Sequence, residues 1–203
     1  MADYTVHIVD DEEPVRKSLA FLLTMAGFTV RVHESATTFV DAAPSIRNGC
    51  LVTDLRMPDM TGVELLRQLG VMSANIPSIV ITGHGDVPMA VAAMKAGALD
   101  FIEKPFEDEV LIEAIKRAAA KLSSEPGGED VVAIRTLLER LSEREREVLS
   151  GVVAGLPNKT IAYDLDISPR TVEVHRANVM SKMEARSLPE LVRMALAAGF
   201  GPA

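Results

Sequence analysis

Residues 78–104 read SIVITGHGDVPMAVAAMKAGALDFIEK. The stretch begins with an apolar, β-branched run, Ser78–Thr82, and ends with a second run of the same kind, Leu99–Glu103. Between these runs, residues 86–96 have helical character, and Asp86 can cap the helix. A strand, a helix and a second strand of these lengths predict a βαβ unit with parallel strands.

The same alternation extends over residues 4–122. Further strands are predicted at Tyr4–Val9, Phe28–Val32 and Cys50–Thr53, and further helices at residues 13–26, 35–42, 61–69 and 107–121. The later strand segments are nearly continuous apolar runs, as expected for parallel strands that are covered on both faces. Five βα repeats of this length predict a doubly wound, five-stranded parallel sheet.

The second part of the chain has a different pattern. Residues 123–128 form a polar, Pro/Gly-rich break that is typical of a linker. Beyond it, helices are predicted at residues 131–141, 142–154, 158–164, 168–183 and 187–199, with Ser142, Asn158, Ser168 and Ser187 as capping residues. We therefore expect an all-α domain after the α/β domain.

Composition excludes several classes of protein. The 203 residues include a single cysteine, so an internal disulfide framework is excluded. No apolar run has the roughly 20 residues of a membrane span, and the beginning of the chain has no secretory signal pattern, so we expect a cytoplasmic protein without a membrane partner. The net charge of −8 argues against a nucleic-acid partner when it is taken over the whole chain.

Polar residues follow the carboxyl ends of four predicted strands, the edge where open α/β sheets place their sites. They are Asp10 and Asp11, Asp54, Thr82 and Lys104. Clustered carboxylates repel one another unless a cation lies between them, and Mg²⁺ prefers a few carboxylates together with water and phosphate oxygens. The pattern therefore predicts a site for Mg²⁺ and a phosphoryl group.

Each of these residues also has a simpler explanation. Asp10 and Asp11 could cap the first helix, Asp54 could be a turn residue, Thr82 an ordinary strand residue and Lys104 a solvated surface lysine. Turns and caps explain the residues singly, but they do not explain why all five lie on one predicted edge.

Four segments resemble the receiver domain of two-component response regulators, which has a flavodoxin-like fold. They are HIVDDE (7–12), VTDLRMPDMTG (52–62), IVITG (79–83) and DFIEKPF (100–106), and the resemblance covers residues 1–122. It implies that Asp54 is the phosphoacceptor, that Lys104 and Thr82 contact the phosphoryl group, and that the Lys104–Pro105 bond is cis. It also implies that Mg²⁺ or Mn²⁺ is held by Asp10, Asp11, Asp54 and the backbone carbonyl of Arg56, and that Phe101 is a switch residue with Thr82.

The predicted helix 168–183 has two distinct sides. At 100° per residue, Val172, His175, Val179 and Met183 form a stripe that is expected to pack on other helices. The opposite side carries Arg170, Glu173, Val174, Ala177 and Ser181. Polar, basic and small residues of this kind suit a helix that lies in the major groove of DNA.

Three segments of this second part resemble the LuxR-type helix-turn-helix: LSEREREVL (141–149), GLPNKTIA (155–162) and ISPRTVEVH (167–175). The whole chain resembles the NarL/FixJ family, which implies a receiver at 1–122, a partly helical linker at 123–136 and a DNA-binding domain at 137–203. The resemblance implies base contacts from Glu173, Val174 and Ala177, and phosphate contacts from Lys159, Arg170, Thr171, His175, Arg176 and, less firmly supported, Lys182. Many relatives have lysine at the position of Glu173.

The function implied by the resemblance is a phosphorylation-controlled transcription activator of nitrogen-fixation genes. Its implied partners are a sensor histidine kinase, promoter DNA, RNA polymerase and, when phosphorylated, a second copy bound through the receiver. The charged residues of segment 107–121 could form ion pairs in such a dimer, or could be only a solvated face. Such a protein accepts a phosphoryl group but is not a turnover enzyme.

Two other functions compete with this interpretation. A Mg²⁺-dependent phosphohydrolase could use Asp54 as its nucleophile, although Arg56 stands where a second carboxylate would serve as general acid. The second domain could bind RNA or protein instead of DNA. The groove-facing side of helix 168–183 argues against this alternative. Residues 1–122 hold 11 basic and 17 acidic residues, residues 123–203 hold 10 and 12, and segment 168–182 has a net charge of +2, so the acidic total does not exclude a nucleic-acid partner. The acidity of the chain therefore lies mainly in the receiver.

Overall fold

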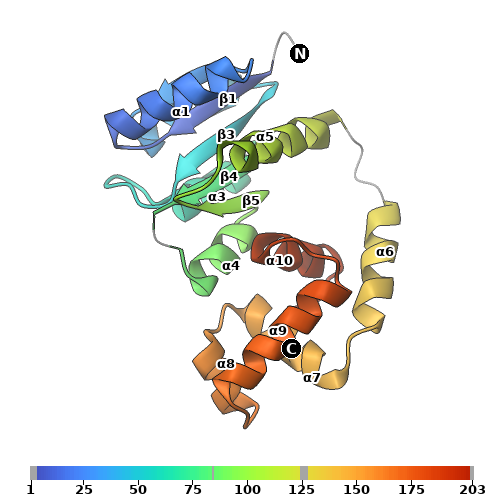
Figure 1. Ribbon diagram of the computed structural model, residues 1–203. Coiled ribbons are helices and arrows are strands. Elements are labelled where there is room, and N and C mark those ends of the chain that lie inside the picture. Colours follow the sequence, from blue (N-terminus) through green and yellow to red (C-terminus); the bar gives the residue numbers. More distant parts are fainter. Residues whose placement is uncertain (1–3, 84, 124–127, 202–203) are drawn as a thin grey trace. The chain divides into compact units, whose positions relative to one another are not determined.

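The computed structural model describes residues 4–83, 85–123 and 128–201, and it divides into two compact units (Figure 1). One unit comprises Met1–Gly85 and Ala96–Glu125, and the other comprises Asp86–Lys95 and Pro126–Ala203. No helix among the described residues is long and apolar enough to cross a membrane.

The first unit contains a five-stranded parallel sheet. In chain order the strands are β1 (Thr5–Val9), β2 (Thr29–His33), β3 (Gly49–Asp54), β4 (Ser78–Thr82) and β5 (Asp100–Glu103). Their spatial order is β2-β1-β3-β4-β5, and every neighbouring pair is parallel. The doubly wound sheet predicted from the sequence is confirmed, and each strand boundary differs from the prediction by one residue at most.

The helices that connect the strands also follow the predicted order. They are α1 (Glu13–Met25), α2 (Ala36–Ala42), the short 3₁₀ helix η1 (Ala43–Ser45), α3 (Gly62–Val71), α4 (Val87–Lys95) and α5 (Asp108–Ser123). The predicted cap of α4 is present, because the Met89 N–H donates to Asp86 Oδ1 over 2.8 Å. Asp86 therefore satisfies one of the N–H groups that a helix start leaves without a partner.

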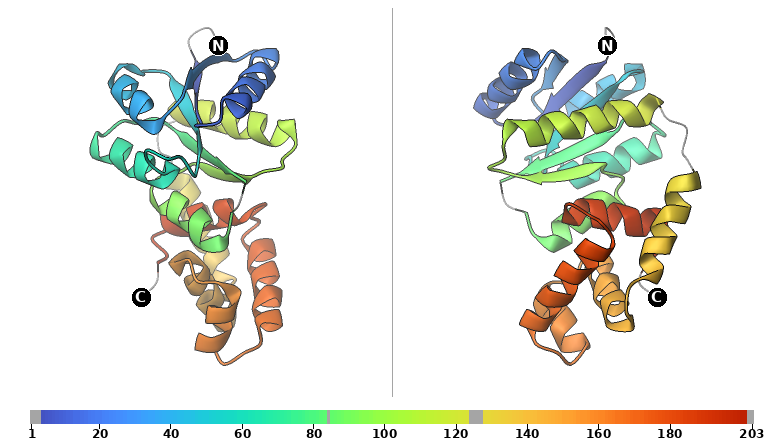
Figure 2. Two further views of the ribbon diagram at one scale, coloured as in Figure 1. Left: turned by 90° about the vertical axis from the view of Figure 1, so that its left-hand side faces the viewer. Right: turned by 45° about the vertical axis from the view of Figure 1, so that its right-hand side comes forward.

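The core of the sheet has two layers. Helices α1 and α5 cover one face, where Leu23, Leu111 and Ile115 pack against apolar strand residues such as Ile8 and Val52. Helices α2 and α3 cover the opposite face, where Phe39, Leu65 and Leu69 are buried with Val9 and Leu51. Figure 2 shows these two pairs of helices on opposite sides of the sheet. Burial on both faces explains why the central strands β3 and β4 are nearly continuous apolar runs.

The remaining helices form a small all-α core. They are α6 (Gly128–Glu139), α7 (Glu143–Ala154), α8 (Asn158–Asp164), α9 (Pro169–Lys182) and α10 (Leu188–Ala197). Leu149 and Val153 of α7 are buried together with Val179 and Met183, which belong to the apolar stripe predicted for α9. Leu191 of α10 completes this cluster. Residues 128–136 of the predicted linker lie in α6, and residues 124–127 lie outside the described residues.

Most of the predicted caps are present, but one is wrong. Ser142 and Glu145 form a reciprocal capping box at the start of α7. Ser168 and Ser187 each accept a hydrogen bond from a backbone N–H in the first turn of α9 and α10. Asn158 does not cap α8, because Pro157 takes the cap position and the Asn158 side chain instead accepts a hydrogen bond from Arg176 of α9.

Candidate functional site

The register of the sheet brings two aspartates together. Val9 of β1 is aligned with Thr53 of the neighbouring parallel strand β3. The residues that follow, Asp10 and Asp54, therefore lie side by side at the carboxyl edge of the sheet. Strand pairing thus brings together two residues that lie 44 positions apart in the sequence, as expected for a site in an open α/β sheet.

Lys104 joins the two carboxylates. It follows β5, and its Nζ donates to Asp54 Oδ1 over 3.0 Å and to Asp10 Oδ2 over 3.4 Å. The Lys104 backbone N–H donates to the Thr82 carbonyl over 2.7 Å, which anchors the lysine to the end of β4. The Lys104–Pro105 bond is cis, as expected from the resemblance.

The electrostatics of this group are shaped by burial. The Asp10 side chain is almost fully buried, and desolvation raises its pKa, with a further contribution from the neighbouring Asp54. For Lys104, burial lowers the pKa, but hydrogen bonds and attraction from the two carboxylates outweigh burial, so the pKa is raised. The ammonium therefore stays charged at neutral pH and partly offsets the two negative charges.

Backbone groups fix the orientation of both carboxylates. The Arg56 N–H donates to Asp54 Oδ2 over 2.6 Å, so both oxygens of Asp54 have partners. The Glu12 N–H donates to Asp10 Oδ1 over 2.9 Å, and Glu12 is the N-cap residue of α1. The simpler interpretation of Asp10 as the N-cap residue of this helix is therefore wrong.

The other predicted residues of this site have different environments. Asp11 is exposed, and in the described part of the chain Lys104 contacts Asp10 and Asp54 rather than Asp11. Thr82 is buried at the end of β4. Phe101 is half-buried on β5, and its ring lies so close to Gly85 that a Cβ atom there would be 2.9 Å from Phe101 Cε1.

The donor set suits a metal that keeps much of its hydration. Among residues 4–83, 85–123 and 128–201, no three or more His, Cys, Asp or Glu side chains gather closely enough to hold a metal ion by themselves. Two adjacent carboxylates, those of Asp10 and Asp54, are nonetheless donors that Mg²⁺ can use when waters and phosphate oxygens complete its octahedron, and Asp11 follows Asp10 directly in the chain. The residues thus fit Mg²⁺ bound together with a phosphoryl group, and do not form an all-protein metal cage.

The sequence interpretation gave no role to Gly62, which the structure places against the backbone of Asp54. Gly62 begins α3 and donates its N–H to the Leu55 carbonyl over 2.9 Å. A Cβ atom at this position would be 2.6 Å from the backbone oxygen of Asp54. Only glycine allows this close approach of two backbones, and the clue in the sequence was the Thr61–Gly62 pair ahead of a helix.

The second candidate site is the outer side of α9. Val172, Val179 and Met183 are buried, and His175 on the same stripe is half-buried, with no partner for its Nδ1 atom among the described residues. The residues of the opposite side are all exposed: Arg170, Glu173, Val174, Ala177 and Ser181. The structure therefore places the predicted base-contact residues together on one solvent-facing side of the helix.

The cations near α9 differ in their freedom to reach a phosphate group. Arg170 pairs with Glu173 one turn away, with 2.9 Å between Nη1 and Oε2. Arg176 is half-buried and donates to Asn158 Oδ1 over 2.7 Å, which links α9 to α8. Lys182 pairs with the buried Glu145 over 2.7 Å, so it stabilises the contact of α9 with α7. Lys159 is exposed, and Thr171 is half-buried in the first turn of α9.

Comparison with known proteins identifies the family. A model of the response regulator receiver domain matches residues 6–116, and a model of the luxR family of bacterial regulatory proteins matches residues 139–195. The chain belongs to the response regulators. This response regulator combines a receiver with a LuxR-type DNA-binding domain, and it regulates transcription.

Individual relatives are similar over the whole chain. The response regulator is 75% identical over 203 residues to the transcriptional regulatory protein FixJ of Rhizobium meliloti (strain 1021), covering 100% of both chains. It is similar to the crystal structure of FixJ-N at 77% identity and a TM-score of 0.57, covering 59% of this chain and 96% of that one. Full-length FixJ from B. japonicum is similar at 48% identity and a TM-score of 0.56, covering 96% and 97% of the two chains.

Proposed function

We propose that Asp54 accepts a phosphoryl group from the phosphohistidine of a sensor histidine kinase. The observation that carries the proposal is the Asp54 carboxylate, oriented by the Arg56 N–H and paired with the Lys104 ammonium at the carboxyl edge of the sheet. A carboxylate oxygen attacks phosphorus, an O–P bond forms, and the P–N bond breaks. The imidazole of the donor leaves and takes up a proton. Lys104 then faces the new charge of about −1.5 to −2.

The proposed cofactor is Mg²⁺ or Mn²⁺, held by Asp10, Asp11, Asp54 and the carbonyl of Arg56. When bound, the ion would neutralise charge on the transferred phosphoryl group. Lys104 and the Thr82 hydroxyl would contact phosphoryl oxygens, and movement of Thr82 would be passed to Phe101. The raised pKa of Asp10 supports a cation beside this carboxylate, because burial and Asp54 disfavour its negative charge.

The proposed output is activation of nitrogen-fixation genes through promoter DNA and RNA polymerase. Similarity to FixJ proteins over the whole chain supports this assignment. Glu173, Val174 and Ala177 are proposed to contact bases, and Lys159, Arg170, Thr171, His175 and Arg176 are proposed to contact phosphates. The exposure of the base-contact residues on one side of α9 supports this division.

A phosphorylated receiver is proposed to dimerise. The charges of α5 give this step little support, because Lys116 pairs with Glu113 and Arg117 pairs with Asp100 within the same chain. The protein is proposed to be a phosphoryl acceptor and not a turnover enzyme. Arg56 supports that choice, because a phosphohydrolase of this kind needs a general acid where the arginine stands.

The test is labelling of the full chain by radioactive acetyl phosphate with Mg²⁺. Asp54→Asn removes the nucleophile, and we expect labelling to fall at least about 100-fold. Asp41→Asn, which changes an exposed carboxylate of α2 in the same unit, serves as the matched control and should label normally. Undiminished labelling of the Asp54→Asn variant would overturn the proposal.

A further inference from the structure

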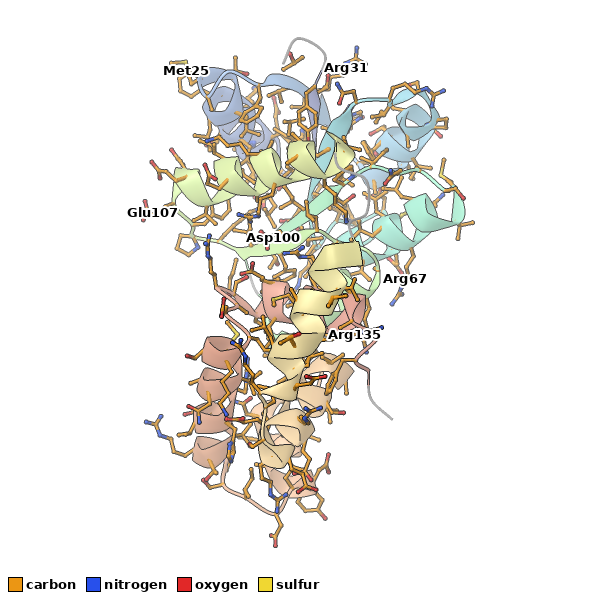
Figure 3. All side chains as sticks on the ribbon, turned by 90° about the vertical axis from the view of Figure 1, so that its right-hand side faces the viewer. Met25, Arg31, Arg67, Asp100, Glu107 and Arg135 are labelled. Atoms are coloured by element: carbon orange, nitrogen blue, oxygen red, sulfur yellow. The ribbon has the colours of Figure 1, made fainter. Side chains whose placement is uncertain are left out.

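A second polar site lies at the amino ends of the strands, opposite the edge that carries Asp54. A surface cavity of about 370 Å³ opens there. The polar residues that line it are Thr5, His7, Arg31, Ser45, Arg47 and Asn48. In Figure 3, Arg31 is labelled on the opposite side of the view from Glu107, which follows the carboxyl end of β5. Neither the phosphoacceptor chemistry nor the DNA-binding helix uses this cavity.

The fold builds the cavity from three neighbouring segments. Thr5 and His7 point to the same face of β1, because side chains alternate along a strand. Arg31 is the aligned partner of His7 on the neighbouring strand β2. The end of η1 and the turn after it supply the remaining residues, and a hydrogen bond of 3.1 Å from the Thr5 N–H to the Asn48 carbonyl fixes the position of this turn.

His7 forms a rigid part of the cavity lining. It is only 3% exposed, and its Nδ1 shares a hydrogen bond of 3.0 Å with His33 Nε2. Its ring also stacks on His33 and meets Phe39 edge-on. A buried histidine held on two sides is preorganised, so a ligand that contacts it restricts the side chain little further and binding costs little conformational entropy.

The charge of the cavity is one-sided. Two guanidinium groups, those of Arg31 and Arg47, line it, and among the residues that the structure describes no aspartate or glutamate does. Both arginines are exposed, and neither forms an ion pair within the described residues. Two cations that line one cavity, without an ion-pair partner in the described part of the chain, create a local positive potential in a unit that is acidic as a whole.

We propose that this cavity binds a small anion through carboxylate or phosphate groups that contact its two arginines. The planar fork of a guanidinium group can bind two oxygens of a carboxylate or of a phosphate through paired hydrogen bonds. The amide of Asn48 and the hydroxyl groups of Thr5 and Ser45 can contact further oxygens. The volume is at the lower end of the range for small-molecule sites, which restricts the ligand to about the size of a tricarboxylate or a sugar phosphate.

Isothermal titration of the unphosphorylated full chain tests the proposal, with citrate and inorganic phosphate as separate probes at constant ionic strength. We expect saturable binding of one ion per chain for at least one probe. Binding of citrate alone would identify a carboxylate site, and binding of phosphate alone would identify a phosphate site. The imidazole resonances of His7 should shift along the same binding curve.

Arginine variants make the test specific. Arg31→Ala and Arg47→Ala should each weaken binding at least about tenfold, since each removes a charge-assisted hydrogen-bond donor. Arg67→Ala is the matched control, because Arg67 is an exposed arginine of α3 outside the cavity (Figure 3). Binding that is unchanged in the first two variants, equally weakened in all three, or absent with both probes would overturn the proposal.

Discussion

At the scale of single residues, Gly62 shows how a site depends on an atom that is absent. The helix α3 starts directly against the backbone of Asp54, the proposed phosphoacceptor, and the missing Cβ of Gly62 makes this approach possible. Thr61 and Glu64 form a capping box that stabilises the start of the helix, so moving this end of α3 away from Asp54 would cost free energy. Any side chain at position 62 must therefore displace either the helix or Asp54.

The first prediction concerns this contact. In Gly62→Ala, the new methyl group would meet the Asp54 oxygen at 2.6 Å, so we expect a loss of about 1–3 kcal/mol in stability and slower phosphorylation. Gly70→Ala is the control in the same helix, because nothing lies within 4 Å of its Cβ position. That variant should be neutral or stabilised by up to about 1 kcal/mol. Denaturant unfolding and acetyl phosphate labelling check both variants, and equal behaviour of the two would contradict the prediction.

The second prediction concerns His7. Burial, with help from His33 and Arg31, lowers the pKa of His7 from 6.5 to about 4. The folded state then binds fewer protons than the unfolded state between these values, so stability falls as the pH drops from 6.5 to 4 and levels off below. The loss attributable to His7 is at most about 3 kcal/mol. The pKa of His33 is lowered in the same direction by burial and by Arg31.

Two measurements check this pH dependence. Titration of the His7 imidazole by NMR should give the lowered pKa directly. Hydrogen exchange of the β1 amides, corrected for intrinsic rates, should show an opening free energy that decreases over the same range. In His7→Gln this decrease should shrink by the part that His7 contributes. A His7 titration midpoint near 6.5 would refute the prediction.

At the scale of elements, the sequence predicted the strands and most helix starts because local rules determine them. Apolar runs specify buried parallel strands, and Ser142, Ser168 and Ser187 have side chains that cap only the turn next to them. Asn158 was predicted wrongly because a contact with Arg176, 18 residues away, competes for its side chain. Such long-range contacts leave no local pattern.

The candidate phosphorylation site likewise has a part that the sequence predicts and a part that depends on long-range packing. Asp10, Asp54 and Lys104 could be assigned to one edge, because the parallel order of βα units places all carboxyl strand ends together. The contact of Arg16 with the Asp10 carbonyl, at 2.6 Å, could not be predicted, because it depends on the angle at which α1 leaves the sheet. The pairing of Lys182 with Glu145 likewise depends on how α9 packs on α7.

The third prediction belongs to α9. Glu173 is exposed and paired with Arg170, and its carboxylate can accept a hydrogen bond from the N4 amino group of cytosine. A lysine would instead donate to guanine. Glu173→Lys should therefore change the ratio of affinities for guanine and cytosine at the contacted position by a factor of about ten or more. It should not simply weaken binding to all sequences. Glu139→Lys, with the same charge change at an exposed position of α6, should keep the original motif. Binding-site selection that returns one motif for all three proteins would refute this assignment.

At the scale of the whole molecule, charge explains why one copy should bind DNA weakly. The chain has a net charge of −8, whereas segment 168–182 has a net charge of only +2. Few phosphate contacts are available to each recognition helix, and the receiver repels DNA at long range. Joining two copies converts the second binding event into an intramolecular one, which can raise apparent affinity by 10²–10⁴ without a new contact.

The last prediction follows from this argument. Phosphorylation of the full chain by acetyl phosphate with Mg²⁺ should double its mass in size-exclusion chromatography with light scattering. The same treatment should raise the affinity for a two-site promoter duplex at least about 100-fold, and should steepen its dependence on salt, because two helices displace more counterions than one. Asp54→Asn, treated identically, should stay monomeric and bind weakly. If the mass and DNA affinity of the phosphorylated protein equal those of the untreated protein, dimerisation is not the switch. The weak DNA binding of the unphosphorylated chain would then have a cause other than its single recognition helix.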